Sequence, residues 1–192
     1  MEASITFKAV GKAIGKKTLL ADLSFGVEKG STFVILGENG SGKSMILKLL
    51  VGLIEKDTGS VYIHGQDISN RSIETRSMCG YMPQVINLDE DLTIFDNILI
   101  YGQLHGLSHA QAKKSTLHWA ELLNFSKYLK QFPNKQAFGL LRKILFARAL
   151  VHDPKVLLLD EPTTGMDPQS RSIVWNILDN LHHNKTIIFV TQ

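Results

Sequence analysis

The decisive stretch of the sequence reads Gly37-Glu38-Asn39-Gly40-Ser41-Gly42-Lys43-Ser44. It matches the pattern G-x-x-x-x-G-K-[ST], with an apolar segment before it at 32–36 and a helix-like segment after it at 45–51. Glycines let successive main-chain N–H groups converge on phosphate oxygens without a Cβ in the way. A helix that begins near Lys43 adds the positive end of its dipole. We therefore predict a strand, a phosphate-binding loop and a helix, in that order.

Two side chains of this loop carry most of the expected chemistry. Lys43 supplies a point charge for the β- and γ-phosphates of a nucleotide, and Ser44 offers a hydroxyl to Mg²⁺. The alternative is a glycine-rich turn that binds nothing. The strand and helix patterns on either side favour the phosphate loop.

A second motif is Val156-Leu157-Leu158-Leu159-Asp160-Glu161, an apolar strand that ends in two carboxylates. Side chains alternate along an extended segment, so we expect the two acids to have different roles. Asp160 can hold Mg²⁺ through its water shell, and Glu161 can accept the proton of an attacking water. Two acids at an ordinary solvated strand end are the alternative. Buried carboxylates without a cation would be costly, which favours a metal-bound nucleotide opposite them.

Strand-like and helix-like segments alternate along most of the chain. Strands are expected at 5–10, 23–27, 32–36, 59–63, 80–84, 156–159 and 186–190. Between 88 and 131 strand signals vanish and two helices are predicted, at 92–104 and 108–123, the second with Ser108 as its N-cap. A further helix is expected at 170–181. This pattern predicts an α/β fold with a parallel sheet, and the wholly apolar segment 32–36 predicts a strand buried on both faces.

Composition limits the class of protein. The chain has 192 residues, 44% hydrophobic and 20% charged, which is typical of one globular domain. Its net charge of +3 is too small to argue for a nucleic-acid partner. The single cysteine, Cys79, fits a reducing compartment, and no apolar run approaches the length of a membrane span. We expect a soluble, cytoplasmic protein.

With these motifs in place, the chain resembles the ATPase subunit of an ATP-binding-cassette (ABC) transporter over essentially all its residues. The phosphate loop matches the Walker A motif, the strand before Glu161 the Walker B motif, and Gln84 the Q-loop. Thr164-Gly165-Met166-Asp167 matches the D-loop, and Ala147-Arg148-Ala149-Leu150 the helix after the signature motif. The segments 88–97 and 101–106 resemble the subgroup that partners ABC-2-type export permeases.

The resemblance implies a P-loop NTPase parallel-sheet core, an N-terminal antiparallel β-subdomain and an inserted helical subdomain. The core lobe would comprise residues 1–87 and 140–192, and the helical subdomain residues 88–139, within one ABC ATPase domain. Such subunits usually continue for another helix or more, so we expect a C-terminal truncation at Gln192.

The resemblance also implies a function. Members of the family bind Mg-ATP as homodimers or heterodimers and drive an integral-membrane permease from the cytoplasmic face of the cell (inner) membrane. Gln84 would act in catalysis and contact Mg²⁺ together with Ser44 and Asp160. The chemistry of the transported substrate belongs to the permease.

The sequence departs from the family at three positions. Gln136-Ala137-Phe138-Gly139-Leu140 stands where the signature is Leu-Ser-Gly-Gly-Gln, so a serine hydroxyl is lost and Phe138 obstructs a close approach to phosphate. Gln192 replaces the switch histidine, which leaves a neutral donor to the γ-phosphate. Ile14 replaces the aromatic residue that stacks on adenine and retains only dispersion contact.

These departures keep three hypotheses open. The first is an ATPase that drives a permease, and the second is a regulatory subunit that binds ATP but hydrolyses it poorly. The intact Glu161 favours the first, and the altered signature favours the second. The third, a soluble ABC ATPase acting on ribosomes or DNA, would need a second cassette or a coiled coil.

Overall fold

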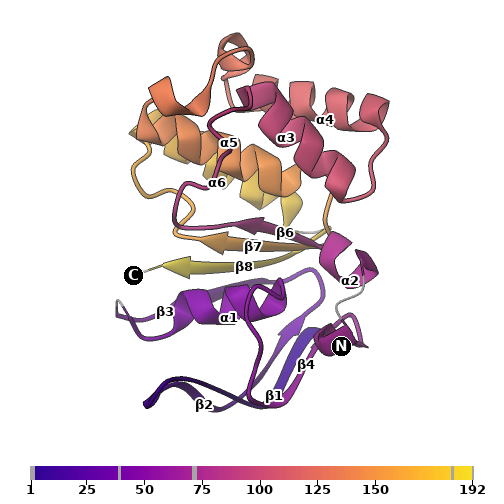
Figure 1. The fold of residues 1–192 in the computed structure, drawn as a ribbon, viewed down its shortest axis with the longest axis vertical. Helices are drawn as coiled ribbons and strands as arrows, with labels where there is room; N and C mark the ends of the chain where they lie inside the picture. The colour runs from indigo at the N-terminus through magenta and orange to yellow at the C-terminus, as the bar shows by residue number, and fades with distance from the viewer. Residues whose placement is uncertain (1–2, 39, 71–72, 183, 192) are drawn as a thin grey trace.

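The computed structural model describes residues 3–38, 40–70, 73–182 and 184–191, and this part of the chain forms two β-sheets (Figure 1). The antiparallel sheet has the order β2–β1–β4–β5, with strands β1 (Ala3–Ile14), β2 (Lys17–Glu28), β4 (Thr58–Ile63) and β5 (Gln66–Asp67). The parallel sheet has the order β3–β8–β7–β6, with strands β3 (Thr32–Leu36), β6 (Cys79–Met82), β7 (Val156–Asp160) and β8 (Thr186–Thr191). The expected combination of an N-terminal antiparallel sheet and a parallel core is confirmed.

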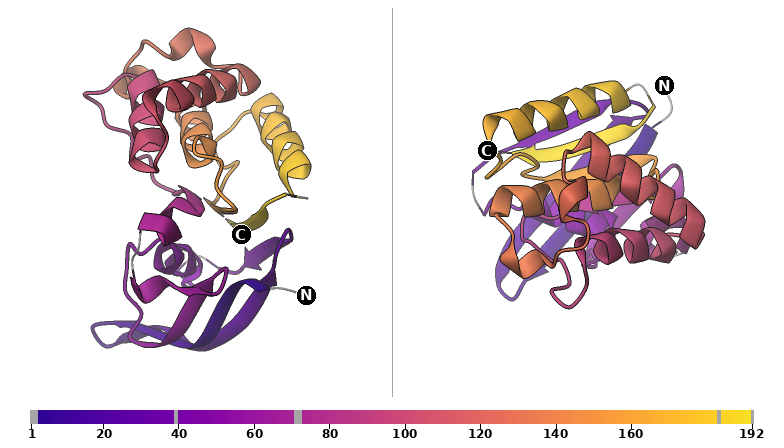
Figure 2. Two further views of the ribbon diagram at one scale, coloured as in Figure 1. Left: turned by 90° about the vertical axis from the view of Figure 1, so that its right-hand side faces the viewer. Right: turned by 90° about the horizontal axis from the view of Figure 1, so that it is seen from above.

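Helices cover the parallel sheet on both faces. The α-helices of the described residues are α1 (Lys43–Leu50), α2 (Ile73–Ser77), α3 (Ile94–Leu104), α4 (His109–Leu122), α5 (Phe138–Leu150) and α6 (Pro168–Leu181). Short 3₁₀ turns lie at Ile68–Asn70, Ser126–Tyr128 and Pro133–Lys135. Helix α1 lies between the two sheets, and α3, α4, α5 and α6 gather on the opposite side of the parallel sheet (Figures 1 and 2).

Strand β7 joins the two hydrophobic cores. Leu157 and Leu159 belong to the core under α3, α5 and α6, whereas Val156 and Leu158 belong to the core around α1 and the antiparallel sheet. Every residue of β7 is buried, because alternate side chains enter opposite cores.

Strand β3 differs from the expectation of burial on both faces. Within the described residues it pairs only with β8 and forms an edge of the sheet, so Leu36 is 68% exposed. The prediction was wrong because an apolar composition does not reveal how many neighbours a strand has. Its apolar side chains alternate between half-buried and exposed positions.

The expected helices after residue 88 are present, and side-chain caps fix their starts. Thr93 accepts a hydrogen bond from the Asp96 N–H at the start of α3. Ser108 caps α4 as predicted, in a capping box with Gln111. The segment between β6 and β7 is free of strands among its described residues, as predicted. The subdomain boundaries at 88 and 139 stay a prediction.

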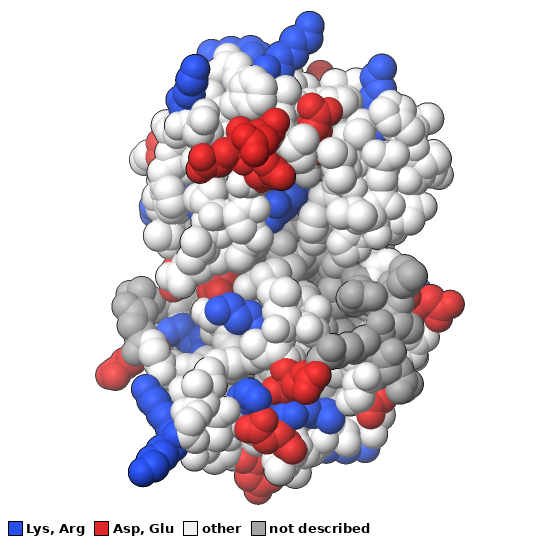
Figure 3. All heavy atoms as spheres, in the orientation of Figure 1, with Lys and Arg blue, Asp and Glu red and all other residues white. Residues whose placement is uncertain are grey.

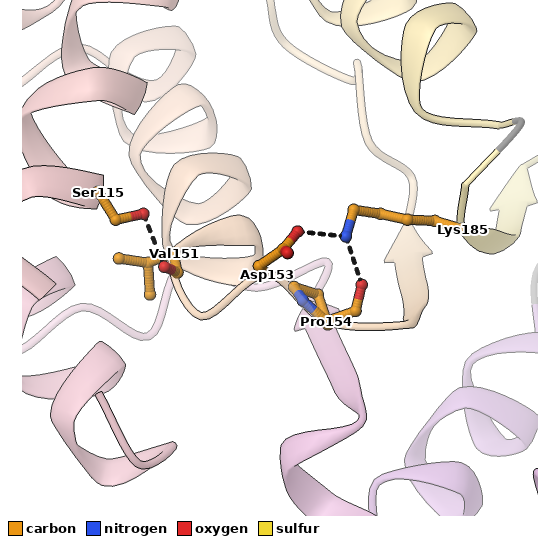
Figure 4. Close-up of polar contacts among 5 residues, drawn as sticks. All are labelled: Ser115, Val151, Asp153, Pro154 and Lys185. Carbon is orange, nitrogen blue, oxygen red and sulfur yellow. Dashed lines mark hydrogen bonds and ion pairs between the residues drawn. The ribbon is translucent and has the colours of Figure 1, made fainter. Parts of the chain in front are cut away.

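Polar contacts hold the connection from α5 to β7 (Figure 4). Ser115 Oγ of α4 donates to the Val151 carbonyl (2.7 Å). The ammonium of Lys185, just before β8, donates to Asp153 Oδ1 (2.5 Å) and to the Pro154 carbonyl (2.7 Å). These bonds tie the connection to both α4 and β8.

The surface carries charges of both signs. Basic and acidic side chains are interspersed on the face shown in Figure 3, in keeping with the small net charge. Among the described residues, the helices are too short or too polar to cross a membrane.

The close approach of α5 to β6 depends on Gly80. A Cβ at this position would lie 2.0 Å from the Ala149 carbonyl oxygen and 2.7 Å from Pro154 Cγ. Real Cβ atoms essentially never come within 3.0 Å of such atoms, so only glycine lets the helix and the strand pack this closely.

We predict that Gly80→Ala lowers the free energy of unfolding by about 2–3 kcal/mol, because α5 or β6 must shift. Gly26→Ala is the matched control, since the nearest atom to its added Cβ is 3.8 Å away. Urea unfolding of the two variants and the parent measures the difference. A Gly80→Ala midpoint equal to that of the parent would contradict the packing described here.

Candidate active site

The phosphate loop leads from β3 into α1, as the sequence predicts. Gly40 and Gly42 have positive φ angles of 80° and 94°, and Gly42 is the N-cap of α1. A Cβ on Gly42 would lie 3.1 Å from the Leu19 carbonyl oxygen. Glycine is therefore required at this position both for its backbone conformation and for its contact with β2. Asn39 lies outside the described residues.

The Lys43 ammonium is folded into the loop that precedes it. It donates hydrogen bonds to the carbonyls of Gly37 and Glu38, the second at 2.8 Å, and the side chain is buried. Both acceptors are uncharged, so they do not cancel its positive charge. The loop thus holds a cation at the place where the sequence predicts a phosphate.

A cleft of about 230 Å³ opens beside the loop and unites most of the expected site. Its walls come from β2, the phosphate loop, α1, the segment after β6, the end of β7 and β8. The lining residues are Leu19, Gly40, Gly42, Lys43, Ser44, Met45, Lys48, Gln84, Asp160, Glu161 and Val190.

The remaining predicted site residues lie elsewhere. Gly37, Glu38 and Ser41 belong to the loop but do not line the cleft. Ile14, at the end of β1, is 59% exposed and is also absent from the lining, so its contact with adenine stays a prediction. Gln192 lies outside the described residues.

Asp160 is a buried carboxylate with spare hydrogen-bonding capacity. Burial raises the pKa of its carboxyl group, a hydrogen bond from Ser44 opposes the rise, and the Glu161 charge adds to it. Within the described part of the chain, Asp160 Oδ1 is buried and accepts no hydrogen bond. An unpaired carboxylate oxygen beside a hydroxyl is a hard-oxygen donor set that suits Mg²⁺. These residues fit the metal that the sequence predicts.

Glu161 lines the same cleft as Asp160 because the backbone leaves the extended conformation after Asp160. Strand β7 ends at Asp160, and Glu161 has a φ of 52°, in the left-handed region. The alternation of an extended strand breaks here, so both acids face the cleft. Glu161 Oε2 accepts a hydrogen bond from Thr164 Oγ1 (2.9 Å), and the Glu161 N–H donates to the Val190 carbonyl (3.0 Å). The two acids therefore keep separate partners.

Sequence reasoning missed several residues of the cleft. Lys48 is one helical turn after Ser44, so the i, i+4 spacing could have placed it on the same face of α1. Leu19 and Val190 come from distant strands and carried no local signal. Thr164 does not line the cleft, and its motif gave no sign that its hydroxyl would bond to the Glu161 carboxylate.

The altered signature segment lies at the start of α5. Ala137 is the N-cap of this helix and gives no side-chain hydrogen bond, where a serine could have capped it. Phe138 is 50% exposed, and its ring lies over Gly165, where an added Cβ would be 2.4 Å from Phe138 Cδ1. Gly139 also faces this segment, because an added Cβ would lie 3.0 Å from the Gly165 carbonyl oxygen.

Comparisons with known proteins agree with this geometry. The profile of the family described as "ABC transporter" matches residues 20–164. The Nod factor export ATP-binding protein I of Paraburkholderia xenovorans (strain LB400) is 39% identical over 192 residues, which is 100% of this chain and 63% of that protein. The linearmycin resistance ATP-binding protein of Bacillus subtilis (strain 168) is 34% identical over 95% of this chain and 59% of its own length. The chain thus spans less than two thirds of these relatives.

Solved structures with the same fold are also similar. The dimeric structure of a bacterial ABC transporter cassette has a TM-score of 0.90 and 25% identity, covering 97% of this chain and 87% of its own. An ATP binding subunit of an ABC transporter has a TM-score of 0.90 at 24% identity, covering 98% of this chain and 79% of its own.

We predict that Lys43→Ala weakens nucleoside triphosphate binding about 10- to 100-fold, because a charged hydrogen-bond donor to phosphate is lost. Isothermal calorimetry with ATP measures the change. Lys113→Ala, at an exposed position of α4, is the control and should bind like the parent. Unchanged affinity in Lys43→Ala would refute the assignment of this loop.

Proposed function

Because the chain belongs to the ABC transporter family, we propose that it binds Mg-ATP and, as a dimer, couples ATP hydrolysis to transport by a separate membrane permease. The observation that carries this proposal is one cleft that combines a phosphate loop, a cation and two buried carboxylates. These groups belong to Lys43, Ser44, Gln84, Asp160 and Glu161.

The loop and Lys43 would hold the phosphates of ATP. A phosphate oxygen offers the Lys43 ammonium a charged acceptor in place of the neutral carbonyls of Gly37 and Glu38. Ile14 would supply an apolar contact to adenine. Gln192, at the switch position, would donate to the γ-phosphate.

Ser44, Asp160 and Gln84 would hold Mg²⁺, which when bound offsets the negative charge of the phosphates. The Asp160 carboxyl, whose pKa burial raises, has to be ionised to ligate the metal. The unpaired Oδ1 of Asp160 supports this role.

Glu161 is the proposed general base. Its carboxylate would accept a proton from a water whose oxygen attacks the γ-phosphorus, while the bond from that phosphorus to the β-phosphate oxygen breaks. The products are ADP and inorganic phosphate. The hydrogen bond from Thr164 would hold the carboxylate in place while leaving its second oxygen for the water.

The family and the relatives support the proposed partners. The names of two relatives describe them as export and resistance ATP-binding proteins, and one similar structure is dimeric. We infer a permease of the ABC-2 export type and a location on the cytoplasmic face of the membrane. A homodimer and a heterodimer with another ATPase subunit are both compatible with the fold.

The signature segment favours a second candidate, a regulatory subunit that binds ATP and hydrolyses it slowly. In the family, the signature of one subunit completes the site of the other. Ala137 offers no hydroxyl, and the Phe138 ring occupies the surface over Gly165. In a homodimer this change affects both sites, whereas in a heterodimer it affects only the partner's site.

We predict that Glu161→Gln lowers ATP turnover by about 10²- to 10⁴-fold and leaves ATP binding intact, because an amide cannot accept the proton. Phosphate release at saturating ATP measures turnover, and calorimetry measures binding. Glu90→Gln, an exposed acid, is the control. Parent-like turnover in Glu161→Gln would show that another group is the base.

We also predict that the isolated chain turns over slowly and that Ala137→Ser with Phe138→Gly and Gln192→His raises its rate. Two lost donors at about 1–3 kcal/mol each correspond to about 30-fold to 10⁴-fold in rate. Steady-state phosphate release compares parent and restored proteins. Ala137→Ser alone is the control, because it adds a helix cap but keeps Phe138. A fast parent with no gain on restoration would rule out this role of the signature.

A further inference from the structure

Arg142 is a fully buried cation whose hydrogen bonds end at the cleft. It lies on α5, is 1% exposed, and reaches the C-terminal ends of two neighbouring parallel strands, β6 and β7. Its Nη1 donates to the Pro83 carbonyl (2.7 Å) and the Gln84 carbonyl (2.9 Å). Its Nη2 donates to the Asp160 carbonyl (2.9 Å) and the Glu161 carbonyl (2.5 Å).

The planar guanidinium explains why one side chain can make all four bonds. Its terminal nitrogens form a rigid fork, so one serves the end of β6 and the other the end of β7. Main-chain carbonyls beyond the last ladder bond of a strand need other donors when they are buried. Arg142 satisfies two such pairs and thereby sets the spacing between Gln84 and Glu161.

The bond to Glu161 acts on a strained residue. A non-glycine residue with positive φ persists only where its surroundings hold it. The Glu161 N–H donates to the Val190 carbonyl, and its own carbonyl accepts from Arg142, so the main chain is fixed on both sides. Loss of the Arg142 bond frees one side.

We propose that Arg142 is a positioning residue that holds Gln84, Asp160 and Glu161 in one arrangement through their main-chain carbonyls. This inference rests on the proposed ATPase function of the cleft. Arg142 acts on the acids and on Gln84, whereas Lys43 is held by its own loop carbonyls, so the phosphate loop should keep its affinity without it.

The decisive variant is Arg142→Lys, which keeps the charge but replaces the fork with a single nitrogen. The matched control is Arg148→Lys on the same helix. Arg148 is also buried, but it donates to the carbonyl and side chain of Asn87 rather than to the cleft. Arg142→Met removes all donors and serves as the severe variant if it folds, which thermal unfolding checks.

Three measurements separate positioning from general damage. We expect binding of a non-hydrolysable ATP analogue in EDTA to stay within about twofold of the parent in Arg142→Lys. The Mg²⁺ concentration that gives half of the metal-dependent gain in analogue binding should rise about 5- to 10-fold. The single-turnover rate at saturating Mg-ATP should fall about 10- to 100-fold, since a misplacement of about 1 Å can cost 10²-fold. Arg148→Lys should match the parent in all three.

The other possible outcomes of these measurements also decide for or against the positioning role of Arg142. A Mg²⁺ midpoint and a rate within threefold of the parent in Arg142→Lys would overturn the proposal, as would equal losses in Arg148→Lys. If the parent itself hydrolyses no ATP, the ATPase proposal fails, and the Mg²⁺ midpoint alone decides the role of Arg142. If Arg142→Met folds, a loss larger than that of Arg142→Lys supports positioning, and an equal or smaller loss argues against it.

Discussion

Strand β7 is the element on which the rest of the structure depends, because its side chains enter both hydrophobic cores. Leu157 and Leu159 pack under the helices, and Val156 and Leu158 pack toward α1. A shift of β7 by one residue would exchange the side chains that enter the two cores. Because both sets of side chains are apolar, the cores alone do not fix the register of the strand, and the polar residue at its end does. The register with β6 and β8 therefore has to place Asp160 at the C-terminal end of the strand, beside the phosphate loop.

The cleft concentrates buried charge, and within the described residues Asp160 Oδ1 has no hydrogen-bond partner. Asp160 and Glu161 are both buried, and Lys43 and Arg142 are the buried cations near them. Both cations donate hydrogen bonds to main-chain carbonyls. Lys43 donates to Gly37 and Glu38, and Arg142 donates to carbonyls at the ends of β6 and β7. The acids are therefore not neutralised by direct ion pairs with these two cations. Burial raises the pKa of the Asp160 carboxyl group, and the charges of Lys48 and Arg142 only oppose this rise.

Local patterns predicted the parts of this molecule that depend on local chemistry. The phosphate loop and the Ser108 cap follow from residue types at fixed spacing, and both are where the sequence places them. The edge position of β3 could not be predicted, because pairing partners are set by topology. The left-handed Glu161 and the lining residue Leu19 depend on contacts with β8 and on the path of β2, which no short window contains. Arg142 reads in the sequence as an ordinary helix residue, and only its burial gives it a role.

Helix α5 carries both the exposed Phe138 at its start and the buried Arg142. Phe138 and Arg142 are one turn apart, so they lie on the same face of the helix. This face follows the segment after β7: Arg142 donates to the carbonyls of Asp160 and Glu161, and Phe138 lies over Gly165. Thr164, next to Gly165, donates to the Glu161 side chain. Thr164 and Gly165 are consecutive, so the Phe138 ring lies beside the segment whose threonine side chain holds the Glu161 carboxylate. The segment that resembles an altered signature thus packs against the turn that follows Glu161.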